Sequence, residues 1–225
     1  MRLISPTTDI NEADWKTSRL KLKAIELAGR TCYKSEGKIT ETSYKGFIKK
    51  LISMGHESVL EHEKVTIRFV IDRGVSHELV RHRICSFSQE STRYCDYGET
   101  GVKFIIPPWV DLEEGTYDVN DLGAGTVKGA LINEATLVWV HAMLNAEFAY
   151  NSLRLKGWSP QQARAVLPNS LKTEIVVTAN FREWRTIFKQ RTANAAHPQM
   201  REVMVPLLEE MRNLFEPIFD DILIQ

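Results

Sequence analysis

One stretch of the chain concentrates side chains that can bind a phosphate or the edge of a heterocycle. It begins with Arg81-His82-Arg83, three positively chargeable side chains in succession, and ends with Arg93 and Tyr94. The hydroxyl, amide and carboxylate groups between them belong to Ser86, Ser88, Gln89, Glu90, Ser91 and Thr92. This density of cations and hydrogen-bonding groups favours a nucleotide or anion site over an ordinary exposed basic turn.

A second basic cluster runs from Asn180 to Arg191. Its residues Arg182, Arg185 and Lys189 recur at helical spacing, which predicts a solvated basic face for Arg185 and Lys189. Arg191 differs because it ends the expected helix, where its charge also suits the negative end of the helix dipole. Outside this cluster, Arg164 interrupts an apolar run and needs an anionic partner if it is buried.

The histidines do not form a metal site by their spacing. His77 and His82 nearly match the H-E-x-x-H pattern of zinc hydrolases, but they are five residues apart, about 140° around a helix. Two histidines so placed cannot hold one ion. His56 and His62 can meet only across a bend in the chain, so we expect capping roles for them and no metal centre.

Composition excludes several classes of protein. The 225 residues are 43% hydrophobic and 26% charged, with 29 basic and 29 acidic side chains, so no whole-molecule field attracts nucleic acid or anionic membrane. The apolar runs are far shorter than the ~18 residues of a membrane span. The polar amino terminus lacks a secretory core, and three cysteines without C-x-x-C spacing fit a reducing compartment. We expect a cytoplasmic protein with no membrane or nucleic-acid partner.

The periodicity of apolar residues predicts a mixture of helices and strands. Expected helices span 15–33, 42–54, 74–83 (after a cap at Asp72), 126–156, 160–168, 181–192 and 198–219. Expected strands span 64–71, 102–106 and 175–179. No linker or internal repeat divides the chain, so we predict one interwoven α+β domain over residues 1–225 with a mostly antiparallel sheet.

Two long segments between these elements have particular expectations. The glycine-containing stretch 111–126 is typical of a mobile surface connection or lid. The proline-free stretch 126–156 predicts a long central helix of roughly 45 Å. Because its apolar residues surround much of its circumference, we expect burial on more than one side, including between subunits.

The Arg81-His82-Arg83 motif, followed by Ser91 and Arg93-Tyr94, resembles the signature of the flavin-dependent thymidylate synthases. Flanking stretches fit in the same order from about residue 28 to residue 202. They are Gly55-His56-Glu57-Ser58, Glu61-His62, Ala163-Arg164, Leu167-Pro168, Asn180-Phe181-Arg182, and Arg191 with His197.

The resemblance implies reductive methylation of dUMP to dTMP. Methylenetetrahydrofolate would give the carbon, FAD would carry the hydride and NADPH would reduce the flavin. It implies a homotetramer whose sites combine several subunits, and it requires no protein nucleophile. Cys85, inside the motif, is therefore interpreted as a packing residue.

The resemblance also implies roles for individual residues. Arg191 corresponds to the catalytic arginine, whose cation would stabilise negative charge on the uracil ring. Substrate contacts are implied for Glu78, Arg81, Gln89, Glu90, Ser91, Thr92, Arg93, Arg164 and Arg191. Flavin contacts are implied for Ser58, Arg81, His82, Arg83, Gln89, Asn180, Arg182 and Thr186.

Three of these positions depart from the family pattern. Glu78 replaces a glutamine that often touches dUMP, Gln89 replaces a common glutamate, and Thr186 replaces an asparagine or histidine that often contacts flavin. A carboxylate at Glu78 needs a cation between itself and any phosphate.

Two other functions are compatible with parts of the sequence. The arginines and the aromatic residues Phe87 and Tyr94 suit a module that binds single-stranded RNA or DNA, although zero net charge counts against it. A metal-dependent nucleotide hydrolase would use His56, His62 and Glu57. Both alternatives explain fewer of the matching positions.

Overall fold

Alternating apolar residues build the two long strands of the protein, β3 (Lys64–Asp72) and β10 (Lys172–Asn180). The computed structural model, which describes residues 1–224, places both inside a four-stranded sheet of order β2-β3-β10-β4, with β2 at Thr7–Ile10 and β4 at Ser86–Gln89. One face of these strands is fully buried, at Val65, Ile67, Phe69, Ile175, Val177 and Ala179. The two strands predicted at 64–71 and 175–179 are confirmed.

Six short strands form two further sheets. β1 (Arg2–Ile4) lies parallel to β5 (Lys103–Ile105) and antiparallel to β6 (Gly115–Thr116). In the other sheet β8 (Thr126–Val127) lies antiparallel to both β7 (Leu122–Gly123) and β9 (Ala130–Leu131). Mixed helices and largely antiparallel sheets confirm the predicted α+β class.

The helices account for most of the remaining ordered chain. The α-helices are α1 (Glu12–Lys16), α2 (Ser18–Tyr33), α3 (Ser43–Ser53), α4 (Arg73–Leu79), α5 (Tyr97–Thr100), α6 (Glu134–Leu155), α7 (Pro160–Ala163), α8 (Phe181–Arg191) and α9 (Pro198–Leu214). The 3₁₀ turns are η1 (Glu36–Lys38), η2 (Glu57–His62), η3 (Val119–Asp121) and η4 (Arg164–Val166). None of the helices in residues 1–224 is long and apolar enough to cross a membrane.

The chain forms two compact units, each assembled from segments distant in sequence. Unit 1 comprises Met1–Thr7, Val70–Leu79 and Gln89–Ile175, and unit 2 comprises Thr8–Phe69, Val80–Ser88 and the chain from Val176 onwards. That residues 1–225 act as one domain stays a prediction.

In unit 2, α8 and the segment that follows α9 supply an apolar core rich in aromatic rings. Phe181 packs edge-on against Phe215 at a centroid distance of 4.9 Å, and Phe188 packs against Phe219 at 5.4 Å. Trp184 is fully buried, and its indole nitrogen donates a hydrogen bond of 3.0 Å to the Val65 carbonyl. This bond joins α8 to β3 and fixes the direction in which α8 presents its polar residues.

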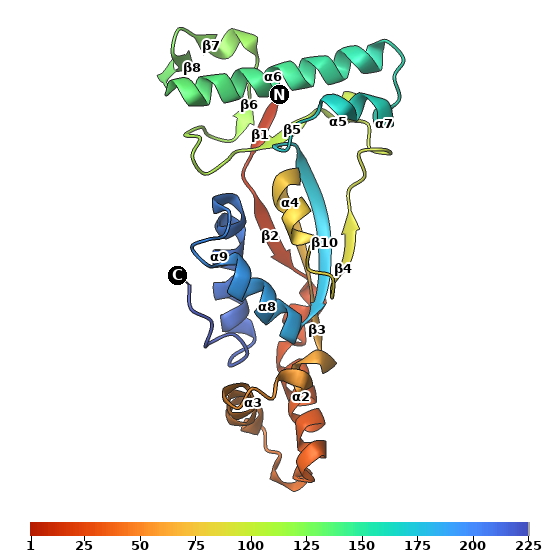
Figure 1. Cartoon of the computed structure of the whole chain (residues 1–225), viewed down its shortest axis with the longest axis vertical. Coiled ribbons are helices and arrows are strands. Elements are labelled where there is room, and N and C mark those ends of the chain that lie inside the picture. Colours follow the sequence, from red (N-terminus) through yellow and green to blue (C-terminus); the bar gives the residue numbers. More distant parts are fainter. Residues whose placement is uncertain (225) are drawn as a thin grey trace. The chain divides into compact units, whose positions relative to one another are not determined.

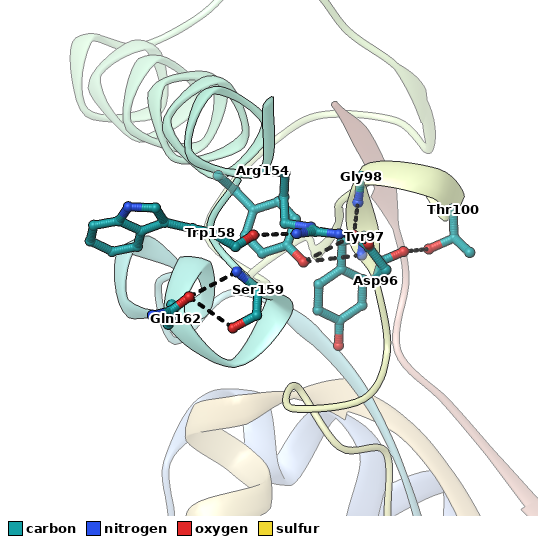
Figure 2. A network of polar contacts seen from close by, with 9 residues as sticks. Asp96, Tyr97, Gly98, Thr100, Arg154, Trp158, Ser159 and Gln162 are labelled. Carbon is teal, nitrogen blue, oxygen red and sulfur yellow. Dashed lines mark hydrogen bonds and ion pairs between the residues drawn. The ribbon is translucent and has the colours of Figure 1, made fainter. Parts of the chain in front are cut away.

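In unit 1, the long helix α6 packs against the sheet formed by β1, β5 and β6 (Figure 1). A polar network lies at the C-terminal end of this helix. Arg154 pairs with Asp96, which caps α5 by accepting from the Gly98 amide at 2.9 Å (Figure 2). The Tyr150 hydroxyl accepts a hydrogen bond from the Tyr97 amide at 3.2 Å. These contacts hold the start of α5 against α6.

The long helix is shorter than the sequence predicts. Residues 126–131 form β8 and β9, and α6 begins only at Glu134 after a cap in which Asn133 accepts from the Thr136 amide at 2.7 Å. Lys128 and Gly129 take positive φ angles of 48° and 78° between the two strands, a hairpin turn incompatible with a helix. The 22 residues of α6 span about 33 Å rather than 45 Å.

The structure adds detail in two other segments. The stretch 111–126, expected as a mobile surface connection or lid, contains β6, η3 and β7, with η3 capped by Asp118, and its mobility stays a prediction. Helix α4 ends at Leu79 rather than at Arg83, so Arg81-His82-Arg83 lies in the turn that follows it. The cap at Asp72 is confirmed, since its carboxylate accepts from the Val75 amide at 2.6 Å.

Replacing the buried indole of α8 is expected to weaken unit 2. Trp184→Phe removes packed volume and the donor to the Val65 carbonyl, so the free energy of unfolding should fall by about 2 kcal/mol. Trp15, which is 54% exposed, provides the matched control, and Trp15→Phe should change it by less than about 0.5 kcal/mol. Urea unfolding measures the free energy of unfolding of both variants. Equal losses in Trp184→Phe and Trp15→Phe would show that Trp184 does not stabilise unit 2 in this way.

Candidate functional site

The turn after α4 buries the middle residue of the Arg81-His82-Arg83 motif and leaves its two arginines exposed. His82 retains only 7% of its accessible surface. Its Nε2 accepts a hydrogen bond of 3.0 Å from Nε of Arg191, the last residue of α8. Its Nδ1 lies 3.6 Å from Oε1 of Glu183, in the first turn of the same helix. The structure thus brings together two predicted site residues that are far apart in sequence.

These contacts determine the protonation of His82. Burial, followed by the positive charge of Arg191, lowers the pKa of His82 from its ordinary value near 6.5 to about 4. The imidazole is therefore neutral at physiological pH, with its proton on Nδ1 because Nε2 is the acceptor. Burial also raises the pKa of Glu183.

Cys85 lies near this cluster, and its thiol has low reactivity. Burial, with a further contribution from the charge of Glu183, raises the pKa of its thiol to about 12. Thiolate, the reactive form, is then scarce at neutral pH. This environment supports the interpretation of Cys85 as a packing residue.

A cavity of about 590 Å³ in unit 2 collects several predicted flavin residues or their partners. It is lined by Lys21, Glu61, His62, Glu63, Lys64, Arg83, Ile84, Cys85, Ser86, Thr178, Ala179 and Asn180. The Asn180 side-chain oxygen caps α8 by accepting from the Glu183 amide at 2.8 Å, which leaves its amide group as a donor. Arg182 pairs with Glu61 at 2.5 Å. Arg83 and Asn180 therefore line the same cavity, together with Glu61, the partner of Arg182.

The remaining flavin candidates of unit 2 lie on exposed surface. Ser58 sits in η2, and Thr186 donates a hydrogen bond of 3.2 Å to the Arg182 carbonyl within α8. Arg81 is exposed in the turn after α4. None of these three lines the 590 Å³ cavity.

Arg185 corrects an expectation from helical spacing. It is 1% exposed rather than solvated, and it pairs with Glu57 of η2 at 3.0 Å and with Asp221 at 2.6 Å. Its partners are distant in sequence, so periodicity alone assigned it to the surface. Lys189, on the same helix, is 50% exposed as predicted.

Unit 1 holds the other group of predicted substrate residues. Arg164 is exposed and donates to the Thr92 hydroxyl at 3.0 Å, so its partner is neutral rather than anionic. The Arg93 amide donates to the Ser91 hydroxyl at 3.3 Å, and the Arg93 guanidinium stacks over Tyr94. Glu78 is half-buried at the end of α4.

Gln89 and Glu90 are engaged by the protein itself. The Gln89 amide donates to the hydroxyls of Ser76 at 2.9 Å and Thr173 at 3.1 Å. Glu90 accepts from Tyr97 and from Lys172, each at 2.9 Å. Burial and the charge of Glu90 raise the pKa of Tyr97, so its phenol stays protonated and donates.

Several residues of these networks had no signal in the sequence. Lys172 and Tyr97 stand 82 and 7 residues from Glu90, and Glu183 is an ordinary acidic residue of a first helical turn. Their contacts follow from the fold, which no local pattern encodes.

The comparisons with known proteins identify the family. A family model described as thymidylate synthase complementing protein matches residues 17–216. Proteins named flavin-dependent thymidylate synthase from Mycobacterium avium and Mycobacterium tuberculosis are each 35% identical over 202 residues, or 88% of this chain and 78% of the relative. This chain belongs to the flavin-dependent thymidylate synthase family. The predicted resemblance is confirmed.

Solved structures share the fold of this flavin-dependent thymidylate synthase family member. The UMP/dUMP methylase PolB from Streptomyces cacaoi, bound with 5-Br dUMP, has a TM-score of 0.71 at 24% identity and covers 95% of this chain and 93% of its own. Thymidylate synthase X from Helicobacter pylori, with FAD and dUMP, has a TM-score of 0.67 at 21% identity, covering 97% and 99%. At these identities the likeness establishes the fold alone.

The buried neutral His82 predicts a component of acid sensitivity. Because its pKa is lower in the folded than in the unfolded state, the unfolded chain binds the extra proton between about pH 6.5 and 4. The stability contributed by neutral His82 is present above pH 6.5 and should fall by roughly 3 kcal/mol on acidification to pH 4.

Comparison with His82→Asn isolates this contribution, because Glu183, whose raised pKa acts in the opposite direction, remains in both proteins. Urea unfolding from pH 7 to pH 5 should show a steeper loss of stability in the wild type than in the variant. Parallel profiles would show that His82 titrates normally.

Proposed function

We propose that this protein converts dUMP to dTMP by reductive methylation. In the balanced reaction, methylenetetrahydrofolate supplies the methylene carbon and NADPH supplies a hydride to it by way of FAD. C5 of the uracil loses a proton, and this proton and one from solvent end on the two folate nitrogens that release the methylene. The products are dTMP, tetrahydrofolate and NADP⁺. The observation that carries the proposal is the family match across residues 17–216, with relatives named for this activity at 35% identity.

The lining of the 590 Å³ cavity fits a flavin nucleotide. Its volume lies in the range usual for small-molecule sites. Arg83 and Lys64 offer cations for phosphate, and the Asn180 amide offers a donor to a heterocycle edge. When bound, FAD would supply the hydride that no side chain can provide. We assign Arg83 and Asn180 to its site, with Ser58, Arg81, Arg182 and Thr186 as further proposed contacts.

The proposed pyrimidine residues suit binding without covalent catalysis. Arg191 carries a fixed positive charge, which can stabilise the negative charge that develops on the uracil ring and so make C5 more nucleophilic. Arg164, Thr92, Ser91 and Arg93 offer donors for substrate oxygens. The scarcity of Cys85 thiolate agrees with a mechanism that has no protein nucleophile.

Gln89, Glu90 and Glu78 have narrower proposed roles. Gln89 already donates to two hydroxyls, so its carbonyl oxygen is the group most suited to a ligand donor. Glu90 accepts hydrogen bonds from the ammonium group of Lys172 and the hydroxyl of Tyr97. The positive charge of Lys172 and the hydroxyl proton of Tyr97 offset the repulsion between the Glu90 carboxylate and an anionic substrate. Glu78 remains a proposed substrate contact.

The surface of α6 supports the proposed homotetramer. Val138, Phe148 and Leu155 expose 64%, 73% and 90% of their accessible surface on this helix. Large apolar side chains gathered on one element are typical of an interaction surface. A cytoplasmic location remains a prediction.

Purified protein incubated with FAD and desalted should retain a visible flavin absorption band. With dUMP, methylenetetrahydrofolate and NADPH it should then form dTMP, detected by chromatography, and omission of any one component should stop the reaction. A folded protein that holds no flavin even with dUMP present would contradict the proposal.

Arg191→Ala should lower dTMP formation by at least about 100-fold, because it removes the cation proposed to stabilise the uracil ring. The retained flavin absorption should stay near that of the wild type. Lys189→Ala, which removes an exposed cation from the same helix, is the matched control and should keep its activity. Undiminished turnover in Arg191→Ala would remove this residue from the mechanism.

A further inference from the structure

His82 occupies a position that direct contact with a ligand does not explain. Within a motif whose two arginines are exposed, it is the buried member, and both of its ring nitrogens face side chains of α8. A ring with 7% of its surface accessible has little area to offer a cofactor. Its contacts indicate that it acts by orienting a neighbouring side chain.

The hydrogen bond from Arg191 restricts the orientation of its guanidinium group. Nε is the nitrogen nearest the aliphatic stem, and it donates to His82 Nε2 at 3.0 Å. The guanidinium is planar, so holding Nε fixes the plane in which both Nη groups lie. An arginine side chain otherwise samples many rotamers, and ordering it costs entropy at the moment of binding.

Glu183 completes the arrangement from the other side of the ring. Its carboxylate is 12% exposed and lies 3.6 Å from Nδ1 of His82. A carboxylate there favours the tautomer with the proton on Nδ1, which leaves Nε2 as the acceptor that Arg191 requires. Glu183 and Arg191 are eight residues apart on α8, about two helical turns, so one rigid element carries both ends of the chain of contacts.

We infer that Glu183 and His82 are positioning residues that hold the Arg191 guanidinium ready for the pyrimidine. The inference rests on the proposed function, in which Arg191 is the catalytic cation. His82 acts as a neutral acceptor in this role.

The electrostatics of the cluster agree with a neutral ring. A protonated imidazole would place a second positive charge 3.0 Å from Arg191 and would lose the acceptor at Nε2. Burial and Arg191 both oppose that charge. The same two causes that keep His82 neutral therefore keep it competent to hold the arginine.

The first test uses the ligand-free protein and requires no activity. In ¹⁵N-labelled protein, the ring nitrogen shifts of His82, assigned by their loss in His82→Gln, should report the tautomer protonated on Nδ1 from pH 6 to pH 8. The Arg191 Nε–H resonance should be sharp in the wild type and in His82→Gln, whose side-chain oxygen can accept, and broadened by exchange in His82→Phe. A ring protonated on Nε2 would overturn the inference.

The second test separates positioning from ligand binding. His82→Phe should lower kcat about 10- to 100-fold with the KM for dUMP changed less than about threefold, and His82→Gln should recover most of that loss. Glu183→Gln should cause a smaller fall in kcat. His77→Gln, at an exposed histidine of α4, is the matched control.

The outcomes distinguish this inference from the proposed function. If the wild type forms no dTMP, the proposed function fails, while the resonances still decide whether His82 holds Arg191. If the wild type is active but His82→Phe retains full kcat, or if His82→Gln is no better than His82→Phe, His82 is not a positioning residue. Circular dichroism and urea unfolding identify any variant that fails to fold.

Discussion

The buried guanidinium of Arg185 is the interaction on which the arrangement of unit 2 depends. Its Nε and Nη2 both donate to Glu57, and its Nη groups donate to Asp221 and to the Ile218 carbonyl. A guanidinium that is 1% exposed would be very costly without such partners. The network therefore fixes η2, α8 and the C-terminal segment together.

The Arg185 network also fixes the elements that carry the proposed site residues. Glu57 immediately precedes Ser58, and α8 carries both Arg191 at its end and Glu183 in its first turn. The same helix is anchored by Trp184 and Phe188, which are fully buried and stack on each other at a centroid distance of 5.8 Å. Polar residues on such a helix have little freedom of their own, so the geometry of the site follows from core packing as much as from hydrogen bonds.

Strong local patterns predicted most of the fold, and weak ones did not. Helix α3 and strands β3 and β10 have clear periodicity and lie where it places them. The hairpin at Lys128-Gly129 was missed because its strands are two residues long, too short to show alternation. The polar composition of β4 likewise hid a strand, since pairing with β10 rather than side-chain burial defines it.

The site was predicted as a set of residue types, whereas the relations among them come from the fold. A motif such as Arg81-His82-Arg83 indicates that a basic turn binds something, but it does not say which of the three side chains points inward. Physical chemistry favours the histidine for that place. An arginine keeps its charge and must find anionic partners wherever it is buried, as Arg185 does, whereas an imidazole can enter the interior neutral. The contact 109 residues away, with Arg191, then follows from where α8 ends.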